Sequence, residues 1–311
     1  MHLLKFTIAG ETIQIISDQP IHNKVFKSFE PFAVSDNSEL KWSNPLLTIL
    51  LHEEEEDKSF PDILVHSFET DTGNCRLFRE GENYIFSIRG DNALPITLKT
   101  TGETGVVHAF TPSISAIHKA NFIFSIWMAL SMAGAHRMLS MIHSSVIVYK
   151  GRAILFLGES GTGKSTHTAL WVNNIEGSYL LNDDSPVVKV VKHTGSGRGN
   201  STGNGSDSEV EVIVSGSPWS GKGKIYKNEI CPLAAIVRLR QSKTNTIKKL
   251  NTLEAFAALY PSFPPALTAD TLFSEDICKI ISDIIKTSSI FELQALPEKE
   301  AAFLVKETLF S

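Results

Sequence analysis

The chain has 311 residues, of which 42% are apolar and 20% charged, and its formal net charge is −5. This length suits one large or two modest domains, and the composition excludes disordered and fibrous proteins. Acidic residues outnumber basic ones, whereas a protein that binds nucleic acid or an anionic membrane usually has an excess of basic residues. Cys75, Cys231 and Cys278 are odd in number and widely spaced, which indicates neither a disulfide framework nor a zinc site.

Residues 1–110 are predicted to form a β-rich domain. Apolar and polar residues alternate, and glycines at Gly10 and Gly81 separate the alternating runs, which predicts hairpins. This part contains no motif that carries chemistry, so we expect it to serve as a scaffold or a recognition domain. The first residues alternate and include Glu11, unlike a signal peptide, and a cytoplasmic location is expected.

Residues 113–140 are predicted to form a long helix. Its most apolar stretch, 122–135, has 14 residues, whereas a membrane-spanning helix needs about 20. We therefore expect a buried helix and no membrane partner.

The remaining sequence alternates between apolar strands and helices, which predicts a mixed α/β fold. Strands are expected within 143–157, 177–191, 209–215, 233–241 and 289–296. One helix is expected to begin within 163–172, and others are expected within 252–260, 274–287 and 297–309. The segment 193–208 is rich in Gly, Ser and Asn and is expected to be a flexible insertion.

A glycine-rich segment directly follows the apolar residues 153–157. Gly158, Gly163, Lys164 and Ser165 satisfy the Walker A pattern G-x-x-x-x-G-K-[ST] of P-loop proteins. Glycines let successive backbone N–H groups turn toward phosphate oxygens, and the N-terminus of the following helix favours the same anion. The pattern predicts binding of a nucleotide such as ATP with Mg²⁺. The residues expected to contact the nucleotide are Gly158, Glu159, Ser160, Gly161, Thr162, Gly163, Lys164, Ser165 and Thr166.

Two carboxylates, Asp183 and Asp184, follow the next apolar strand. A strand end beside a phosphate loop faces the phosphates, so one of the two carboxylates is expected to hold Mg²⁺. Adjacent strand residues point in opposite directions, and the two are expected to differ in role. The alternative is a turn before Pro186 that the pair caps. His143 begins a strand that pairs naturally with the P-loop strand, which places it at the same sheet edge, as a metal ligand, a partner of the base or a structural histidine.

A second loop, at 215–223, contains Pro218, Trp219 and Lys222 between glycines. One interpretation is a loop over the phosphates, in which Lys222 neutralises charge on a moving phosphoryl group. The other is a turn anchored by Trp219, with its lysines in solvent.

Taken together, the His143 strand, the Gly158–Ser165 motif and the Asp183–Asp184 pair resemble the HPr serine kinase/phosphorylase and ATP-dependent phosphoenolpyruvate carboxykinase superfamily. The resemblance covers residues 140–190 and is closer to the HPr kinase side. It implies that 111–311 is a nucleotide-binding domain with a mixed sheet. It also raises the expectation of a homo-oligomer.

The resemblance implies a role for each matching residue. Lys164 would contact the transferred phosphoryl group, and Ser165 and Asp184 would hold Mg²⁺. Asp183, assisted by His143, would accept the proton of an attacking serine-like hydroxyl, although the assignment of the two aspartates is open.

The expected function is therefore an ATP-dependent kinase acting on a hydroxyl of a protein, peptide or small molecule. A nucleotide-sensing module without transfer and a small carboxykinase-like enzyme are the alternatives. Carboxykinase activity needs several substrate-binding arginines, and the late part of the chain offers mainly Arg238 and Arg240.

Overall fold

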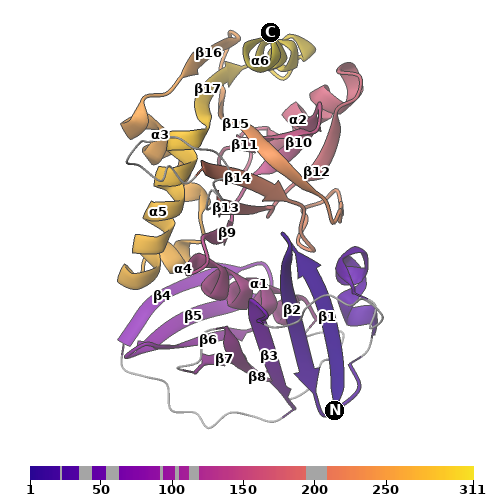
Figure 1. The fold of residues 1–311 in the computed structure, drawn as a ribbon, viewed down its shortest axis with the longest axis vertical. Helices are drawn as coiled ribbons and strands as arrows, with labels where there is room; N and C mark the ends of the chain where they lie inside the picture. The colour runs from indigo at the N-terminus through magenta and orange to yellow at the C-terminus, as the bar shows by residue number, and fades with distance from the viewer. Residues whose placement is uncertain are drawn as a thin grey trace, which may run out of the picture.

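Two mixed β-sheets form the frame of the protein, with one helix between them (Figure 1). The computed structural model describes residues 1–21, 23–34, 44–53, 63–91, 94–101, 105–111, 119–193 and 209–311. The expected flexible insertion at 193–208 lies, apart from residue 193, outside the described residues. The mixed α/β class predicted from the sequence is confirmed.

The first sheet has the strand order β1-β2-β3-β8-β7-β6-β5-β4. Its strands are β1 (His2–Ile8), β2 (Glu11–Ser17), β3 (Leu47–His52), β4 (Ile63–Thr70), β5 (Gly73–Glu80), β6 (Asn83–Arg89), β7 (Ile96–Thr100) and β8 (Val106–Phe110). The run from β4 to β8 is antiparallel throughout, whereas β3 is parallel to both β2 and β8. The predicted hairpins over Gly10 and Gly81 are confirmed.

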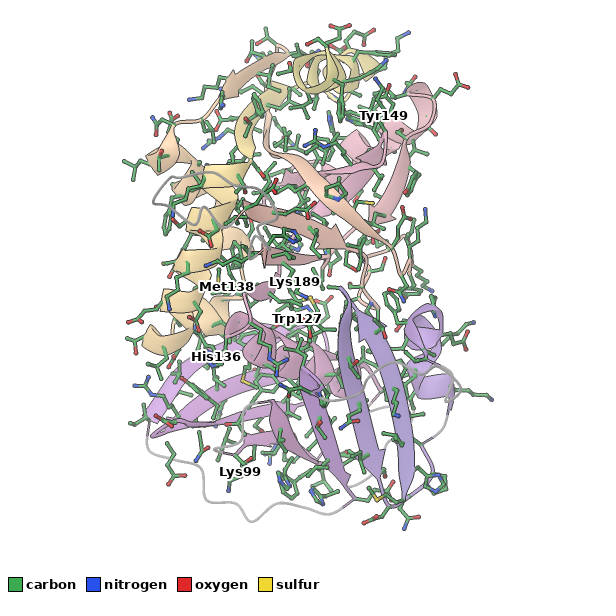
Figure 2. The ribbon with its side chains drawn as sticks, viewed as in Figure 1. Lys99, Trp127, His136, Met138, Tyr149 and Lys189 are labelled. Carbon is green, nitrogen blue, oxygen red and sulfur yellow. The ribbon has the colours of Figure 1, made fainter. Side chains whose placement is uncertain are left out.

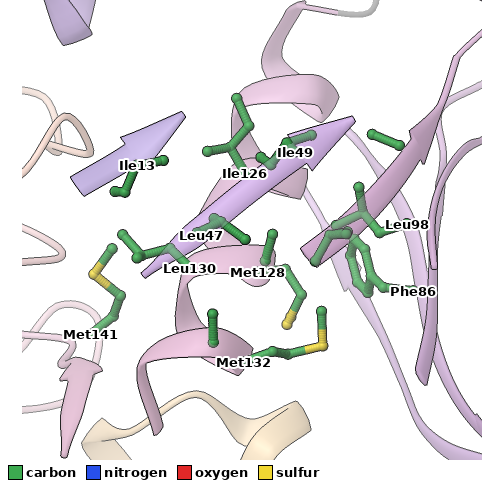
Figure 3. Close-up of a cluster of buried hydrophobic side chains, with 14 of the residues drawn as sticks. Ile13, Leu47, Ile49, Phe86, Leu98, Ile126, Met128, Leu130, Met132 and Met141 are labelled. Carbon is green, nitrogen blue, oxygen red and sulfur yellow. The ribbon is translucent and has the colours of Figure 1, made fainter. Parts of the chain in front are cut away.

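Helix α1 (Lys119–Ala135) covers the apolar face of the first sheet. Alternate strand residues such as Ile13, Leu47 and Phe86 meet Ile126 and Leu130 of the helix in one core (Figure 3). The 3₁₀ segment η1 (Asn23–Phe32) adds aromatic rings to it. The helix is apolar around most of its circumference because both sheets surround it.

The predicted helix over 113–140 is too long at its C-terminal end. Arg137 N donates to Gly134 O at 2.8 Å and Met138 N donates to Ala135 O at 3.2 Å, so the chain turns. It then enters β9 (Leu139–Met141) of the second sheet. The N-terminal part of the prediction, before residue 119, lies outside the described residues. Among the residues described, no helix is both long and apolar enough to cross a membrane.

The second sheet has the order β12-β10-β11-β15-β14-β13-β9, and β15 also pairs with β17, which pairs with β16. Its other strands are β10 (Ser145–Tyr149), β11 (Arg152–Leu157), β12 (Tyr179–Asn182), β13 (Val187–His193), β14 (Glu209–Ser215), β15 (Ile230–Gln241), β16 (Thr246–Lys249) and β17 (Ser289–Ala295). The long strand β15 joins two parts of this sheet. Its first residues pair with β14, and its later residues lie between β11 and β17 in a parallel arrangement.

Helices pack on both faces of the second sheet. Helix α2 (Lys164–Asn174) and α6 (Lys299–Phe310) share one apolar cluster, whereas α3 (Thr252–Leu259) and α5 (Thr271–Thr287) share the other. Two short helices, η2 (Tyr260–Ser262) and α4 (Pro265–Thr268), connect α3 to α5.

The two sheets are joined by buried contacts. Asp270, only 2% exposed, caps the N-terminus of α5 and accepts hydrogen bonds from Tyr84 Oη at 2.9 Å and Arg79 Nη1 at 3.0 Å. Lys189 lies between the sheets in Figure 2 and donates to Glu11 Oε1 at 2.6 Å. Helix α1, which the predicted boundary at residue 111 assigns to the second domain, packs in the core of the first sheet.

Candidate functional site

Strand direction brings three separate segments to one edge of the second sheet. Strand β10 is antiparallel to β11, so its beginning lies beside the end of β11, with Ser145 opposite Phe156. Strand β12 is antiparallel to β10, so its end lies at the same edge, with Asn182 opposite Val146. His143, the glycine-rich loop and the aspartate pair therefore meet there, as expected from the sequence.

The loop between β11 and α2 has the conformation that its glycines permit. Gly161 and Gly163 have φ values of 81° and 98°, in the left-handed region that residues with a Cβ rarely adopt, and Gly163 is the N-cap of α2. Thr162 Oγ1 donates to Glu159 O at 2.7 Å and steadies the turn. The unpaired N–H groups and the positive end of α2 thus lie at this edge, which favours an anion.

Lys164 is folded back onto the loop that precedes it. Its Nζ donates to Gly158 O at 2.6 Å and lies 3.1 Å from His143 Nε2. Burial lowers the pKa of the Lys164 ammonium, and the Asp184 carboxylate opposes that change. The residue is 9% exposed, so its charge is held at a fixed position at the loop.

His143 lies between Lys164 and Asp184. Its Nδ1 is 3.5 Å from Asp184 Oδ1, while Asp184 Oδ2 accepts from Ser185 Oγ at 2.9 Å. Because the ammonium can only donate to Nε2, the network assigns the ring proton to Nδ1, which faces the carboxylate. The His143 ring is the main cause that lowers the pKa of Asp184; burial opposes it, and Ser185 and Lys164 add to the lowering.

Asp183 has different partners from Asp184. Its Oδ1 accepts from Gly221 N at 2.7 Å and from Ser220 Oγ, and its Oδ2 accepts from Gly223 N at 3.0 Å. A Cβ on Gly223 would lie 2.7 Å from Asp183 Oδ2, so a larger residue there would displace the carboxylate. Both carboxylate oxygens hold the 216–223 loop, and the aspartate beside His143 is Asp184. The sequence-based roles gave the partnership with His143 to Asp183.

The loop that Asp183 holds is also attached to the first sheet. Trp219 is buried, donates from Nε1 to Ile123 O of α1 at 3.0 Å and packs edge-on against Phe29 at 5.2 Å between ring centroids. Lys222 is exposed between the two glycines that contact Asp183. The anchored turn expected around Trp219 is confirmed, and the same contacts place Lys222 next to the aspartate pair.

Two further polar residues of the site, Asn182 and Ser217, were not predicted from the sequence. Asn182 Oδ1 accepts from the backbone N–H groups of Asp184 and Ser185, and its Nδ2 donates to Trp219 O at 2.9 Å. Ser217 Oγ donates to Ser185 O at 2.6 Å. An asparagine two residues before a backbone N–H is a typical Asx turn, which is the signal that identifies Asn182.

A hollow of about 430 Å³ lies next to the glycine-rich loop. It is at the carboxyl ends of the parallel strands β15 and β17, where ligands of open α/β sheets usually bind. Its lining residues are Gly161, Thr162, Gly163, Thr166, His167, Leu170, Leu239, Arg240, Gln241, Ser242, Ala295, Leu296 and Pro297. Gln241 Nε2 donates to Gly161 O at 3.0 Å and thereby ties this hollow to the loop. Of these residues, only Gly161, Thr162, Gly163 and Thr166 were predicted from the sequence to contact the nucleotide, and Arg240 was named for another reason.

Hard oxygen donors suitable for Mg²⁺ are present at the edge. Asp184 offers a carboxylate and Ser165, at the start of α2, an exposed hydroxyl. Mg²⁺ usually takes only one or two carboxylates and keeps waters or phosphate oxygens as its other ligands, so this donor set fits it. Within the described part of the chain, no group of three His, Cys, Asp or Glu side chains is arranged to hold a metal.

No protein-family model and no curated protein matches the sequence.

Proposed function

We propose that the chain is an ATP-dependent phosphotransferase of the HPr kinase-like type, acting on a serine-like hydroxyl of a protein, peptide or small molecule. The observation that carries the proposal is the convergence of Lys164, His143 and Asp184 beside the glycine-rich loop. Binding alone requires the loop and the lysine, whereas a histidine paired with a carboxylate is the arrangement that accepts a proton. A sensing module without transfer has no use for that pair.

The nucleotide is expected to lie along the end of the parallel strands. Its phosphates would contact the backbone of 158–165 and the N-terminus of α2, and its nucleoside would occupy the hollow lined by Thr166, Leu170 and Leu296. A volume of about 430 Å³ is within the usual size of a small-molecule pocket. Bound Mg²⁺, with Asp184 and Ser165 as ligands, would neutralise charge on the phosphates.

In the transfer step, the acceptor hydroxyl oxygen forms a bond to the terminal phosphorus while the bond from that phosphorus to the bridging oxygen of ADP breaks. Lys164 stabilises the charge on the moving group, and Lys222, exposed between the two glycines that contact Asp183, supplies a second positive charge. The hydroxyl proton passes to His143 Nε2 as Lys164 turns from the ring to the phosphoryl group, and the Asp184 carboxylate faces the ring N–H at Nδ1. Asp183 keeps the 216–223 loop in place because both of its oxygens accept hydrogen bonds from it.

The first test is ATP binding by a Lys164→Ala variant. Removing the fixed charge should weaken ATP binding by about 10- to 100-fold, because a hydrogen bond between charged groups is worth about 1.5–3 kcal/mol. The measurement is calorimetric titration with ATP and Mg²⁺, and the matched control is Lys150→Ala, which removes an exposed lysine from the β10–β11 turn.

Tripolyphosphate serves as a second ligand in the same titration. It has the phosphates without the nucleoside, so wild-type protein should bind ATP more tightly if the hollow receives the nucleoside. Equal ATP affinity in Lys164→Ala and wild type would contradict the assignment of the loop. A kinase is then separated from a sensing module by transfer of labelled phosphate to candidate hydroxyl acceptors, which His143→Ala should slow without abolishing ATP binding.

A further inference from the structure

A small polar hollow lies on the first sheet, on the face of β5 and β6 opposite to α1. It has a volume of about 220 Å³ and is lined by Asn74, Arg76, Ser87, Arg89 and Pro95. The neighbouring positions Cys75, Leu77, Phe86 and Ile88 point to the other face and belong to the core. The hollow is thus separate from the edge of the second sheet that holds the glycine-rich loop.

The strand register arranges four of these side chains as a rectangle. Arg76 is directly opposite Ser87, and Asn74 is directly opposite Arg89, two residues further along the antiparallel pair. The two arginines therefore occupy one diagonal, at a separation of about 7–8 Å between Cα positions, which long side chains can bridge. Asn74 and Ser87 occupy the other diagonal, so donors approach the same hollow from four sides.

The arginines lack partners that would account for their position. Among the residues that the structure describes, neither the Arg76 nor the Arg89 side chain has a hydrogen bond or an ion pair. Arg79 and Arg240, by contrast, pair with Asp270 and Glu292. Both side chains are exposed, so water screens their mutual repulsion, and an oxyanion between them would lower it further.

Ser87 provides an independent observation. It is 7% exposed and lines the hollow, and its hydroxyl has no hydrogen-bond partner within the described part of the chain. The hydroxyl is open to the hollow, where water or a ligand oxygen can satisfy it. A hydroxyl at that position is suited to donate to an oxyanion.

We propose that this hollow binds an oxyanion, a carboxylate or a phosphate group of a ligand. Arg76 and Arg89 contribute charge and forked donors, which match the planar or tetrahedral oxygens of such groups. Asn74 and Ser87 contribute neutral donors. The β-rich region is then a second binding region, distinct from the glycine-rich loop, and this assignment does not rest on the proposed phosphotransferase activity.

The test compares two double variants of the full chain. Arg76→Gln/Arg89→Gln removes both charges of the hollow, and Lys150→Gln/Lys286→Gln removes two exposed charges from the second sheet and its helix α5. The net charge changes equally in both, so a non-specific electrostatic effect would appear in both. Calorimetric titration uses two probes, acetyl-triglutamate amide for carboxylates and inorganic phosphate.

Wild-type protein should bind at least one probe, and the Arg76→Gln/Arg89→Gln variant should bind it roughly tenfold more weakly, whereas the lysine variant should be unchanged. If the arginine variant binds acetyl-triglutamate amide more weakly than wild type, the ligand group is a carboxylate of an acidic segment. For phosphate, the arginine variant should keep only the binding that the glycine-rich loop provides. Ser87→Ala should give a smaller loss, roughly three- to tenfold. Equal losses in both double variants, or no binding of either probe by wild type at millimolar concentration, would overturn the assignment.

Discussion

The two sheets of the protein are assembled from connections of different length. In the first sheet, β4 to β8 follow one another as neighbours, so most strand pairs join residues that are close in the chain. In the second sheet, β11 lies beside β15 and β15 beside β17, which brings together strands separated by long segments. The first sheet is thus largely a product of local hairpins, and the second depends on contacts that form only when the chain is folded.

This difference extends to the two polar sites. The rectangle of Asn74, Arg76, Ser87 and Arg89 comes from a single hairpin. The site at the glycine-rich loop comes from four segments, around residues 143, 158–165, 183–184 and 220–223. The site at the glycine-rich loop therefore depends on every element that positions one of these segments, including elements of the first sheet.

Trp219 is the residue through which the first sheet supports the second site, and its removal should have the largest effect. Trp219→Ala should lower the free energy of unfolding by about 3–5 kcal/mol, because a buried indole leaves a cavity among Phe29 and α1. It should also weaken ATP binding, because the loop held by Asp183 loses its attachment. Denaturant unfolding and ATP titration measure the two effects.

The matched variant is Trp219→Phe. It keeps a ring against Phe29 but loses the hydrogen bond from Nε1 to Ile123 O, so it should cost only about 1 kcal/mol. If Trp219→Ala lowers stability and leaves ATP affinity unchanged, the first sheet does not position the site.

A titration of stability against pH sharpens the comparison of the two regions. Burial lowers the pKa of His167, on α2, to about 4. In the first sheet, burial raises the pKa of Cys75 to about 12, and burial together with Asp270 raises that of Tyr84 to about 12. Cys75 and Tyr84 stay neutral between pH 5 and 8 in both the folded and the unfolded chain. Of the three groups, only His167 therefore makes the free energy of unfolding depend on pH in this range.

Protonation of His167 favours the unfolded chain. Below its ordinary pKa of 6.5, His167 binds a proton in the unfolded chain but stays neutral in the fold until about pH 4. The unfolded state therefore gains protons, and stability is lost as the pH falls from 6.5 to 4, by about 2 kcal/mol at pH 5. His167→Gln keeps an acceptor for Trp171 Nε1 and should remove that part of the loss between pH 7 and 5. An equal loss in variant and wild type, by urea unfolding at the two pH values, would contradict it.

The sequence predicts the local parts of both regions well. The hairpins over Gly10 and Gly81 and the start of α2 at Lys164 are each fixed by neighbouring residues, and each is confirmed. Gln241 escaped prediction because its partner, Gly161, is far away in the chain. The Asx turn of Asn182 is a local signal, but its contact with Trp219 joins distant residues.

The aspartate pair shows the same limit more sharply. That the two carboxylates differ in role follows from their being adjacent, but which one meets His143 depends on the register of β10 with β12 and on the position of the 216–223 loop. The end of α1 also depends on distant structure, because residues 139–141 leave the helical pattern to pair with β13.

The two aspartate variants are expected to have small effects on stability, and they are the most informative about the site. Asp183→Asn leaves one oxygen for Ser220 Oγ and Gly221 N and turns an amide toward Gly223 N–H, which loses its acceptor. The free energy of unfolding should fall by about 1–2 kcal/mol, the usual cost of one unsatisfied donor. Magnesium should not restore this loss, because it arises in the loop.

Asp184→Asn should differ from Asp183→Asn in both its effect on stability and its response to magnesium. Its side chain is 41% exposed, so stability should change little, but the charge beside His143 and Lys164 disappears. ATP binding should then weaken, and raising magnesium should partly restore it, because the lost charge is the one expected to hold the ion. Thermal unfolding and ATP titration at two magnesium concentrations, on both variants, compare the two aspartates directly. If Asp183→Asn is the variant that magnesium rescues, Asp183 leaves its loop to bind the ion, and the roles that the geometry gives the two residues are reversed.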